Sequence, residues 1–121
     1  MVKFEIQGLN GLEITEAMES YFEKKLNRAC KHNEQLISSV KTNLSYEAKT
    51  DSNIVEIIVF LGGGKTIRNY SRTDDMYASI DIACASIERQ LRKAKEKIID
   101  VRRYRSFEEK FAVADKEKLV A

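Results

Sequence analysis

The sequence predicts an α+β domain with the order β-α-β-β-β-α, in which a four-stranded sheet carries two helices on one face. Short stretches of alternating apolar and polar residues predict the strands, and two longer stretches with apolar residues at helical spacing predict the helices. The length of 121 residues suits one domain rather than two. With 43% hydrophobic and 33% charged residues, the chain can bury a core and is too apolar to be disordered throughout.

The first strand and the first helix are predicted from the opening of the chain. Apolar and polar residues alternate over 2–7 and stop at Gly8, as in a half-buried strand. Thr15 is a good N-cap for a helix over residues 16–31, because glutamates follow in its first turn, where the helix dipole favours them. The apolar residues of this helix recur at helical spacing as Met18, Phe22, Leu26 and Ala29.

Three further strands are predicted in the middle of the chain. Residues 40–46 alternate, and residues 54–61 hold one polar residue in eight, which is typical of a central strand. The glycines at 62–64 tolerate positive φ in a hairpin turn, and residues 65–72 return as the fourth strand. These three strands should form an antiparallel meander.

A long second helix is predicted after the strands. Thr73, Asp74 and Asp75 supply N-cap and first-turn residues, and one apolar stripe then continues for about 25 to 30 residues. The stripe consists of Met76, Ile80, Ala83, Ile87, Leu91, Ala94, Ile98 and Val101. We therefore expect a domain over residues 1–105, followed by a tail or linker over 106–121.

Several functions are excluded by what the sequence lacks. No signal peptide or membrane-spanning run is present, and Cys30 and Cys84 lie in predicted helices, so we expect a cytoplasmic protein with reduced thiols. The string Gly64-Lys65-Thr66 lacks the earlier glycine and the following helix of a phosphate-binding loop. Cys30 and His32 are too few ligands for a structural metal site. We expect no enzyme activity, cofactor, metal or small-molecule substrate.

Positive charge is concentrated on the predicted helices, although the whole chain has a net charge of only +2. Residues 88–105 carry eight basic and three acidic side chains. At 100° per residue, Arg89, Arg92, Lys93 and Arg103 fall opposite the apolar stripe, with Lys95, Lys97 and Arg102 on its flanks. In the first helix, Lys24, Arg28 and Lys31 lie opposite Phe22, whereas Glu16, Glu19, Glu23 and Asn27 gather on one side.

Two interpretations of these cations remain open from the residues alone. If the helices lie side by side, their stripes merge into a basic surface suited to RNA phosphates. The alternative is a solvated face, in which cations pair with neighbouring carboxylates, as Arg92 could with Glu96.

The sheet face away from the helices is a second candidate surface. Ile58 and Phe60 should point to it, where Arg68, Tyr70 and Arg72 could join them. Aromatic rings among arginines can stack RNA bases, and an apolar sheet face can equally form a homodimer interface.

The predicted order of elements is shared by several RNA-binding modules, including the double-stranded RNA binding domain. Over about residues 1–100 the sequence resembles the ribosome hibernation promoting factors, also called ribosome-associated inhibitor A or protein Y. The similarity rests on the segments 2–8, 12–17 and 23–26 and, more specifically, on Asp74-Asp75-Met76-Tyr77-Ala78-Ser79-Ile80-Asp81 and Ile87-Glu88-Arg89-Gln90-Leu91-Arg92-Lys93.

The resemblance implies a protein that binds the small ribosomal subunit and its ribosomal RNA in the decoding channel, where messenger RNA and the A- and P-site transfer RNAs would sit. Binding would inhibit translation and preserve idle ribosomes in stress or stationary phase. The implied RNA contacts are basic residues of the two helices: Lys24, Lys25, Arg28, Lys31, Arg89, Arg92, Lys93, Lys95 and Lys97. A generic structured-RNA-binding module, or a homodimer through the open sheet face, is the alternative.

Long members of that family add a carboxy-terminal dimerisation domain that pairs two ribosomes. The 121 residues leave no room for it, so ribosome dimers are expected only if the full protein has such a domain. Residues 106–121 fit either a native short tail or the linker of a longer protein.

Overall fold

The computed structural model of the chain describes residues 4–97. The chain divides into two compact units, Met1–Leu91 and Arg92–Ala121. The first unit contains the strands β1 (Phe4–Gly8), β2 (Ile37–Glu47), β3 (Ser52–Leu61) and β4 (Thr66–Thr73) and the helix α1 (Glu16–Cys30). It also contains three single-turn 3-10 helices (Glu34–Leu36, Ala48–Thr50 and Gly62–Gly64) and a helical segment over 76–91, and residues 92–97 of the second unit are also helical.

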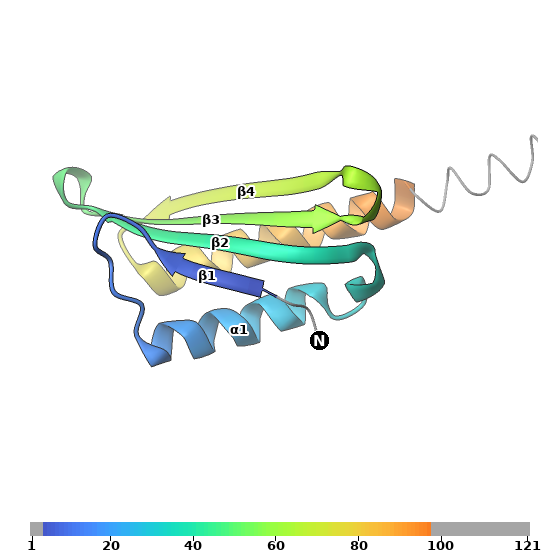
Figure 1. Cartoon of the computed structure of the whole chain (residues 1–121). Helices are drawn as coiled ribbons and strands as arrows, with labels where there is room; N and C mark the ends of the chain where they lie inside the picture. The colour runs from blue at the N-terminus through green and yellow to red at the C-terminus, as the bar shows by residue number, and fades with distance from the viewer. Residues whose placement is uncertain (1–3, 98–121) are drawn as a thin grey trace, which may run out of the picture. The chain divides into compact units, whose positions relative to one another are not determined.

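The four strands form one sheet in the order β1-β2-β3-β4 (Figure 1). β1 pairs with β2 in parallel, and the other two pairs are antiparallel, so the predicted meander is confirmed. The parallel pair follows from the connection, because a strand that returns through a helix enters the sheet in the same direction. α1 and residues 76–91 lie on the same side of the sheet, which confirms the predicted α+β class.

α1 begins and ends close to the predicted positions. The hydroxyl of Thr15 accepts a hydrogen bond of 3.1 Å from the backbone N–H of Met18, which satisfies one of the free donors at the helix start. The helix ends at Cys30, one residue before the prediction. Phe22 and Leu26 are fully buried, and the ring of Phe22 meets that of Phe4 of β1 edge to face at 5.7 Å.

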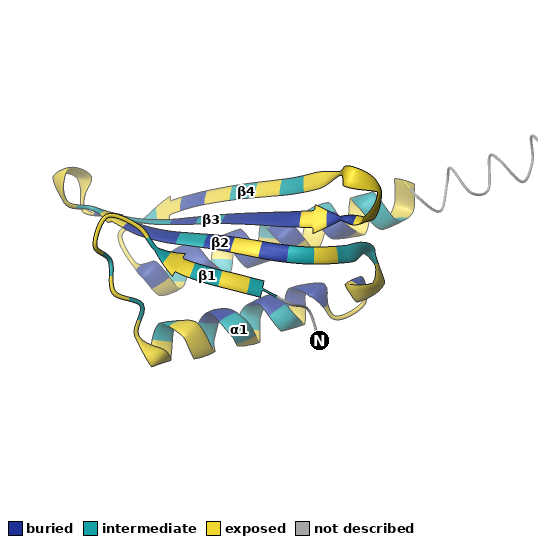
Figure 2. Ribbon diagram, viewed as in Figure 1, coloured by how far each residue is buried: buried dark blue, intermediate teal, exposed yellow. Residues whose placement is uncertain are grey.

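The hydrophobic core lies between the sheet and the helices (Figure 2). One face of the sheet supplies Val40 and Leu44 from β2 and Val55, Ile57 and Val59 from β3, all at most 2% exposed. The central position of β3 explains its nearly continuous apolar sequence. The predicted stripe of the second helix is confirmed through Leu91 by the buried Met76, Ile80, Ala83, Ile87 and Leu91.

Hydrogen bonds also attach the segment 76–91 to the sheet. The carboxylate of Asp75 accepts a 3.2 Å bond from the backbone N–H of Tyr77 at the helix start. The buried hydroxyl of Ser71 donates to the carbonyl oxygen of Ser79 at 2.6 Å, and the hydroxyl of Ser79 donates to the carbonyl oxygen of Asn53 at 2.7 Å. These directional contacts fix the helix along β3 and β4.

Several boundaries differ from the predictions or fall beyond the description. β2 begins at Ile37, ahead of the alternating stretch, with an irregular register between Ile37 and Ser39. Gly63 and Gly64 adopt positive φ in the predicted turn, and strand β4 follows it, so no helix receives a phosphate there. Ala94 is half-buried, whereas Ile98, Val101 and the expected tail over 106–121 lie outside the described residues. Over residues 4–97, no helix is long and apolar enough to cross a membrane.

Candidate nucleic-acid interface

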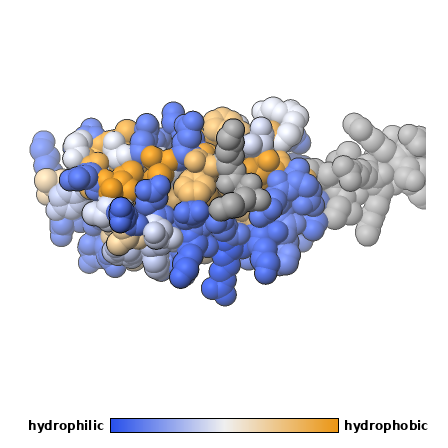
Figure 3. All heavy atoms as spheres, turned by 60° about the horizontal axis from the view of Figure 1, so that its bottom comes forward, coloured by the Kyte–Doolittle hydropathy of each residue, from blue (hydrophilic) through white to orange (hydrophobic). Residues whose placement is uncertain are grey.

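Three cations line the outer face of α1 and of its C-cap residue, Lys31. Lys24, Arg28 and Lys31 are all exposed, opposite the fully buried Phe22 and Leu26. Because these three positions recur at intervals of three or four residues, they form one line along the helix. The face that Figure 3 brings forward carries many protruding hydrophilic side chains on its lower part. α1 therefore presents the basic stripe that its sequence predicts.

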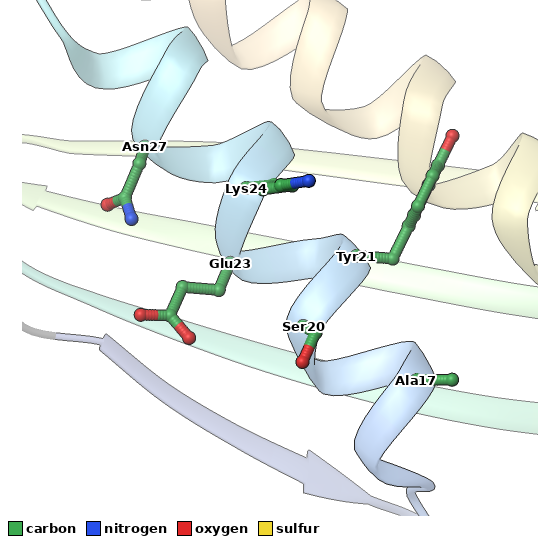
Figure 4. Close-up of a pocket in the computed structure, with 6 residues that line it drawn as sticks. All are labelled: Ala17, Ser20, Tyr21, Glu23, Lys24 and Asn27. Carbon is green, nitrogen blue, oxygen red and sulfur yellow. The ribbon is translucent and has the colours of Figure 1, made fainter.

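The two flanks of α1 differ in charge. A shallow, open depression of about 470 Å³ lies on its outer surface, and Figure 4 shows the six residues that line it: Ala17, Ser20, Tyr21, Glu23, Lys24 and Asn27. In this view the side chains of Tyr21 and Lys24 point toward the side of the second helix, whereas those of Glu23 and Asn27 point the other way. The flank toward the second helix thus carries the cation Lys24, and the opposite flank carries the carboxylate of Glu23.

Lys25 differs from its basic neighbours because it contacts the protein itself. Its ammonium lies 3.3 Å from Oδ1 of Asp81 on the second helix and 5.6 Å from the centre of the Tyr21 ring. The exposed fraction of its side chain is 37%. Lys25 therefore has a carboxylate and an aromatic face as partners in the folded chain.

Tyr21 joins the same contact between the helices. Its hydroxyl donates a 2.6 Å hydrogen bond to Oδ1 of Asp81, and its ring meets that of Tyr77 edge to face at 4.9 Å. The hydrogen bond to Asp81, followed by partial burial, raises the pKa of Tyr21 to about 12. We call Tyr21, Lys25, Tyr77 and Asp81 the inter-helix cluster.

The inter-helix cluster could not be found by sequence reasoning. Asp81 ends the family-like segment 74–81, but that segment assigns it no partner, and its proximity to Tyr21 arises only when the helices pack together. The spacing of Tyr21 and Lys25, one turn apart, was the only available signal.

The remaining predicted RNA contacts lie within the helical residues 76–97. Arg89 is exposed in the first unit, which therefore exposes four of the predicted cations: Lys24, Arg28, Lys31 and Arg89. In the second unit, Arg92, Lys93 and Lys97 are exposed and Lys95 is half-buried. The inter-helix cluster brings the two helices of the first unit together.

The open face of the sheet carries balanced charge. The register places Lys41 of β2 in line with Ile58 of β3 and Arg68 of β4, and the guanidinium of Arg72 pairs with Glu47 at 3.0 Å. Carboxylates of Glu5 and Glu56 lie on the same face. Phe60 and Tyr70 are 37% and 54% exposed, as expected, but Ile58 is only 9% exposed. Among the described residues, equal numbers of both signs give this face little attraction for phosphates.

Neither cysteine is placed for chemistry. Cys30 and Cys84 are buried free thiols, and burial raises their pKa values to about 11 and about 12. His32 is exposed beyond the end of α1. Within residues 4–97, no group of three or more His, Cys, Asp or Glu side chains could hold a metal ion.

Comparison with known sequences decides the family. The family model described as "Sigma 54 modulation protein / S30EA ribosomal protein" matches residues 4–99. This chain belongs to that family. Among proteins similar to this S30EA-family chain, a ribosome hibernation promotion factor of Picosynechococcus is 38% identical over 99 residues, which cover 79% of this chain and 50% of that protein. A ribosome hibernation promotion factor of Staphylococcus aureus is 36% identical over 115 residues, which cover 92% of this chain and 57% of that protein. The chain spans about half the length of these curated relatives.

Solved structures of similar sequence share the fold. A ribosomal subunit interface protein from Coxiella burnetii superposes with a TM-score of 0.70 at 29% identity, over 78% of this chain and 99% of that one. The N-terminal domain of Thermus thermophilus Protein Y gives a TM-score of 0.66 at 34% identity, over 77% of this chain and 98% of that one. This chain therefore shares its fold with that N-terminal domain over most of its length.

Proposed function

We propose that this chain is the ribosome-binding domain of a hibernation factor. It binds the small subunit in the decoding channel at the A and P sites, excludes messenger and transfer RNA, and inhibits translation in stress or stationary phase without catalysing a reaction. The observation that carries the proposal is the line of exposed cations Lys24, Arg28 and Lys31 on α1, held beside the helix that exposes Arg89. Family membership and the names of the relatives support it.

The proposed contacts to ribosomal RNA phosphates are Lys24, Arg28, Lys31, Arg89, Arg92, Lys93, Lys95 and Lys97. Long basic side chains on helices suit this role because they reach phosphates and displace their counterions. Lys25 also belongs to the set that the resemblance implies. Because it already contacts Asp81 and Tyr21, we propose that it contributes less to RNA binding than the other cations. We propose residues 1–105 as the binding domain and 106–121 as a tail or linker, so removing 106–121 should leave binding intact.

Co-sedimentation with purified small subunits across a salt series tests the proposal. If about six phosphates are contacted, log K should fall against log salt with a slope of roughly −4 to −5. The variant Arg89→Glu/Arg92→Glu should stop pelleting and keep the circular dichroism of the wild type. A matched control is Lys41→Glu/Arg68→Glu, which reverses two exposed charges on the open sheet face and should pellet normally.

The place of binding needs its own measurement. Bound protein should prevent P-site transfer RNA from binding to programmed small subunits. No pelleting of the wild type at low salt contradicts the proposal. Equal binding to free duplex RNA instead indicates a generic structured-RNA-binding module. A dimer in light scattering that survives charge reversal, without ribosome binding, indicates a homodimer through Ile58, Phe60 and Tyr70.

A further inference from the structure

Asp81 places a carboxylate beside the cations of α1. It lies on the second helix, and its single oxygen Oδ1 receives both the hydroxyl of Tyr21 at 2.6 Å and the ammonium of Lys25 at 3.3 Å. The side chains of Lys25 and Asp81 are 37% and 45% exposed, so a polyanion can reach the pair from solvent. The carboxylate is therefore part of the surface that faces an approaching phosphate.

The geometry restrains both members of this ion pair. The hydrogen bond from Tyr21 orients the carboxylate, the ring of Tyr77 packs against that of Tyr21, and the ammonium of Lys25 lies near the Tyr21 ring. A freely moving lysine exchanges a carboxylate for a phosphate at little cost, whereas an oriented partner resists this exchange. Even when Lys25 reaches a phosphate, the charge of Asp81 still repels that phosphate.

We infer that Asp81 limits the affinity of the helical face for RNA by neutralising Lys25, an inference that rests on the proposed function. Lys24 and Lys25 are neighbours in sequence, yet only Lys24 fully neutralises a phosphate and so displaces a counterion from the RNA. Asp81 acts through Lys25 and does not itself contact RNA.

The variant Asp81→Asn tests this inference with nearly unchanged shape, because the amide oxygen can still accept from Tyr21. Freeing one cation should steepen the salt slope by about 0.7 and raise small-subunit affinity about fivefold at about 0.1 M salt. The matched control is Glu47→Gln, which frees Arg72 from an equally exposed pair on the open sheet face. It adds the same net charge and should change affinity less than twofold, as a rough bound.

A double-mutant cycle separates charge pairing from structural damage. Lys25→Gln should lose much less affinity than Lys24→Gln in the wild-type background. In the Asp81→Asn background, Lys25→Gln should remove the whole gain of about fivefold and the added slope. A purely structural role for Asp81 would not steepen the salt slope. If Asp81→Asn does not fold, the comparison of Lys25→Gln with Lys24→Gln still tests the inference, because both variants keep Asp81.

Each outcome has a distinct meaning. Wild-type protein that does not pellet overturns the proposed function and the inference with it. Wild-type protein that pellets, together with Asp81→Asn of unchanged or weaker affinity and native circular dichroism, overturns the inference alone. Equal gains in Asp81→Asn and Glu47→Gln, or equal losses in Lys25→Gln and Lys24→Gln, also overturn it.

Discussion

Gly8 passes directly over the carbonyl oxygen of Leu12, so closely that a Cβ atom on Gly8 would lie 2.0 Å from that oxygen. The backbone of the β1–α1 connection folds back against the end of β1 here, and Leu12 donates its N–H to the carbonyl of Leu9 at 3.1 Å. Only a residue without a side chain leaves room for this approach.

We therefore expect Gly8→Ala to lower the free energy of unfolding by about 1 to 3 kcal/mol, because backbone must shift to accommodate the methyl group. Urea unfolding followed by circular dichroism measures the change. The matched control is Gly62→Ala, where an added Cβ meets nothing within 4 Å, and its stability should stay within about 1 kcal/mol of the wild type. Equal effects of the two variants would contradict the close approach at Gly8.

Tyr21 should ionise late in an alkaline titration. Its pKa is raised from 10.0 to about 12, so the folded chain holds the phenolic proton more tightly than the unfolded chain. The stabilisation from this group is complete below pH 10 and is lost as the pH rises from about 10 to about 12. Ultraviolet absorbance of the phenolate measures the titration, and the difference between wild type and Tyr21→Phe isolates Tyr21. The difference is needed because the hydrogen bond to Asp51 raises the pKa of Tyr46 as well. A Tyr21 component near pH 10 would show that the contact with Asp81 is absent in solution.

The two thiols should resist alkylation while the protein is folded. Burial raises the pKa of Cys30 to about 11 and that of Cys84 to about 12, so little thiolate exists near pH 8. Compared with an ordinary thiol of pKa about 8.5, we expect labelling more than about 100-fold slower, and full labelling of both thiols in denaturant. Mass spectrometry of the labelled protein counts the modified thiols. Fast labelling under native conditions would contradict the packing of both helices onto the sheet.

Ser79 should contribute to stability through its hydroxyl. This side chain is fully buried and donates to the carbonyl of Asn53, so Ser79→Ala leaves a polar group without its partner. We expect a loss of about 1 to 3 kcal/mol in the free energy of unfolding. Ser20→Ala is the control, since Ser20 is an exposed residue of α1 and its replacement should change stability by at most about 0.5 kcal/mol. Because alanine has a higher helix propensity than serine, propensity cannot explain a loss in either variant, and a Ser79→Ala variant as stable as the wild type would contradict the buried contact.

Sequence patterns correctly predicted the features that depend on residues close together in the chain. The cap at Thr15, the apolar stripe through Leu91 and the glycine turn follow from contacts within a few residues, and each is confirmed. The early start of β2 at Ile37 was missed because pairing with Leu61 of β3, and not alternation, extends the strand. Lys24, Arg28 and Lys31 are exposed as predicted, but the partner of Lys25 depends on how two helices pack, which no local pattern encodes.

The parallel pairing of β1 with β2 bears on the order in which the domain assembles. Phe4 of β1 is aligned with Val40 of β2, so pairing these two strands closes a loop that contains the whole of α1. The strands β2, β3 and β4 are instead joined by short turns. Closing the longer loop costs more chain entropy, so the meander should form first and the amino-terminal strand should join last. Since β1 is also held on one side only, its amide hydrogens should exchange through an opening of lower free energy than those of β3. Departure of β1 would remove Phe4 from the ring of Phe22, so an opening of this edge would expose part of the core to solvent.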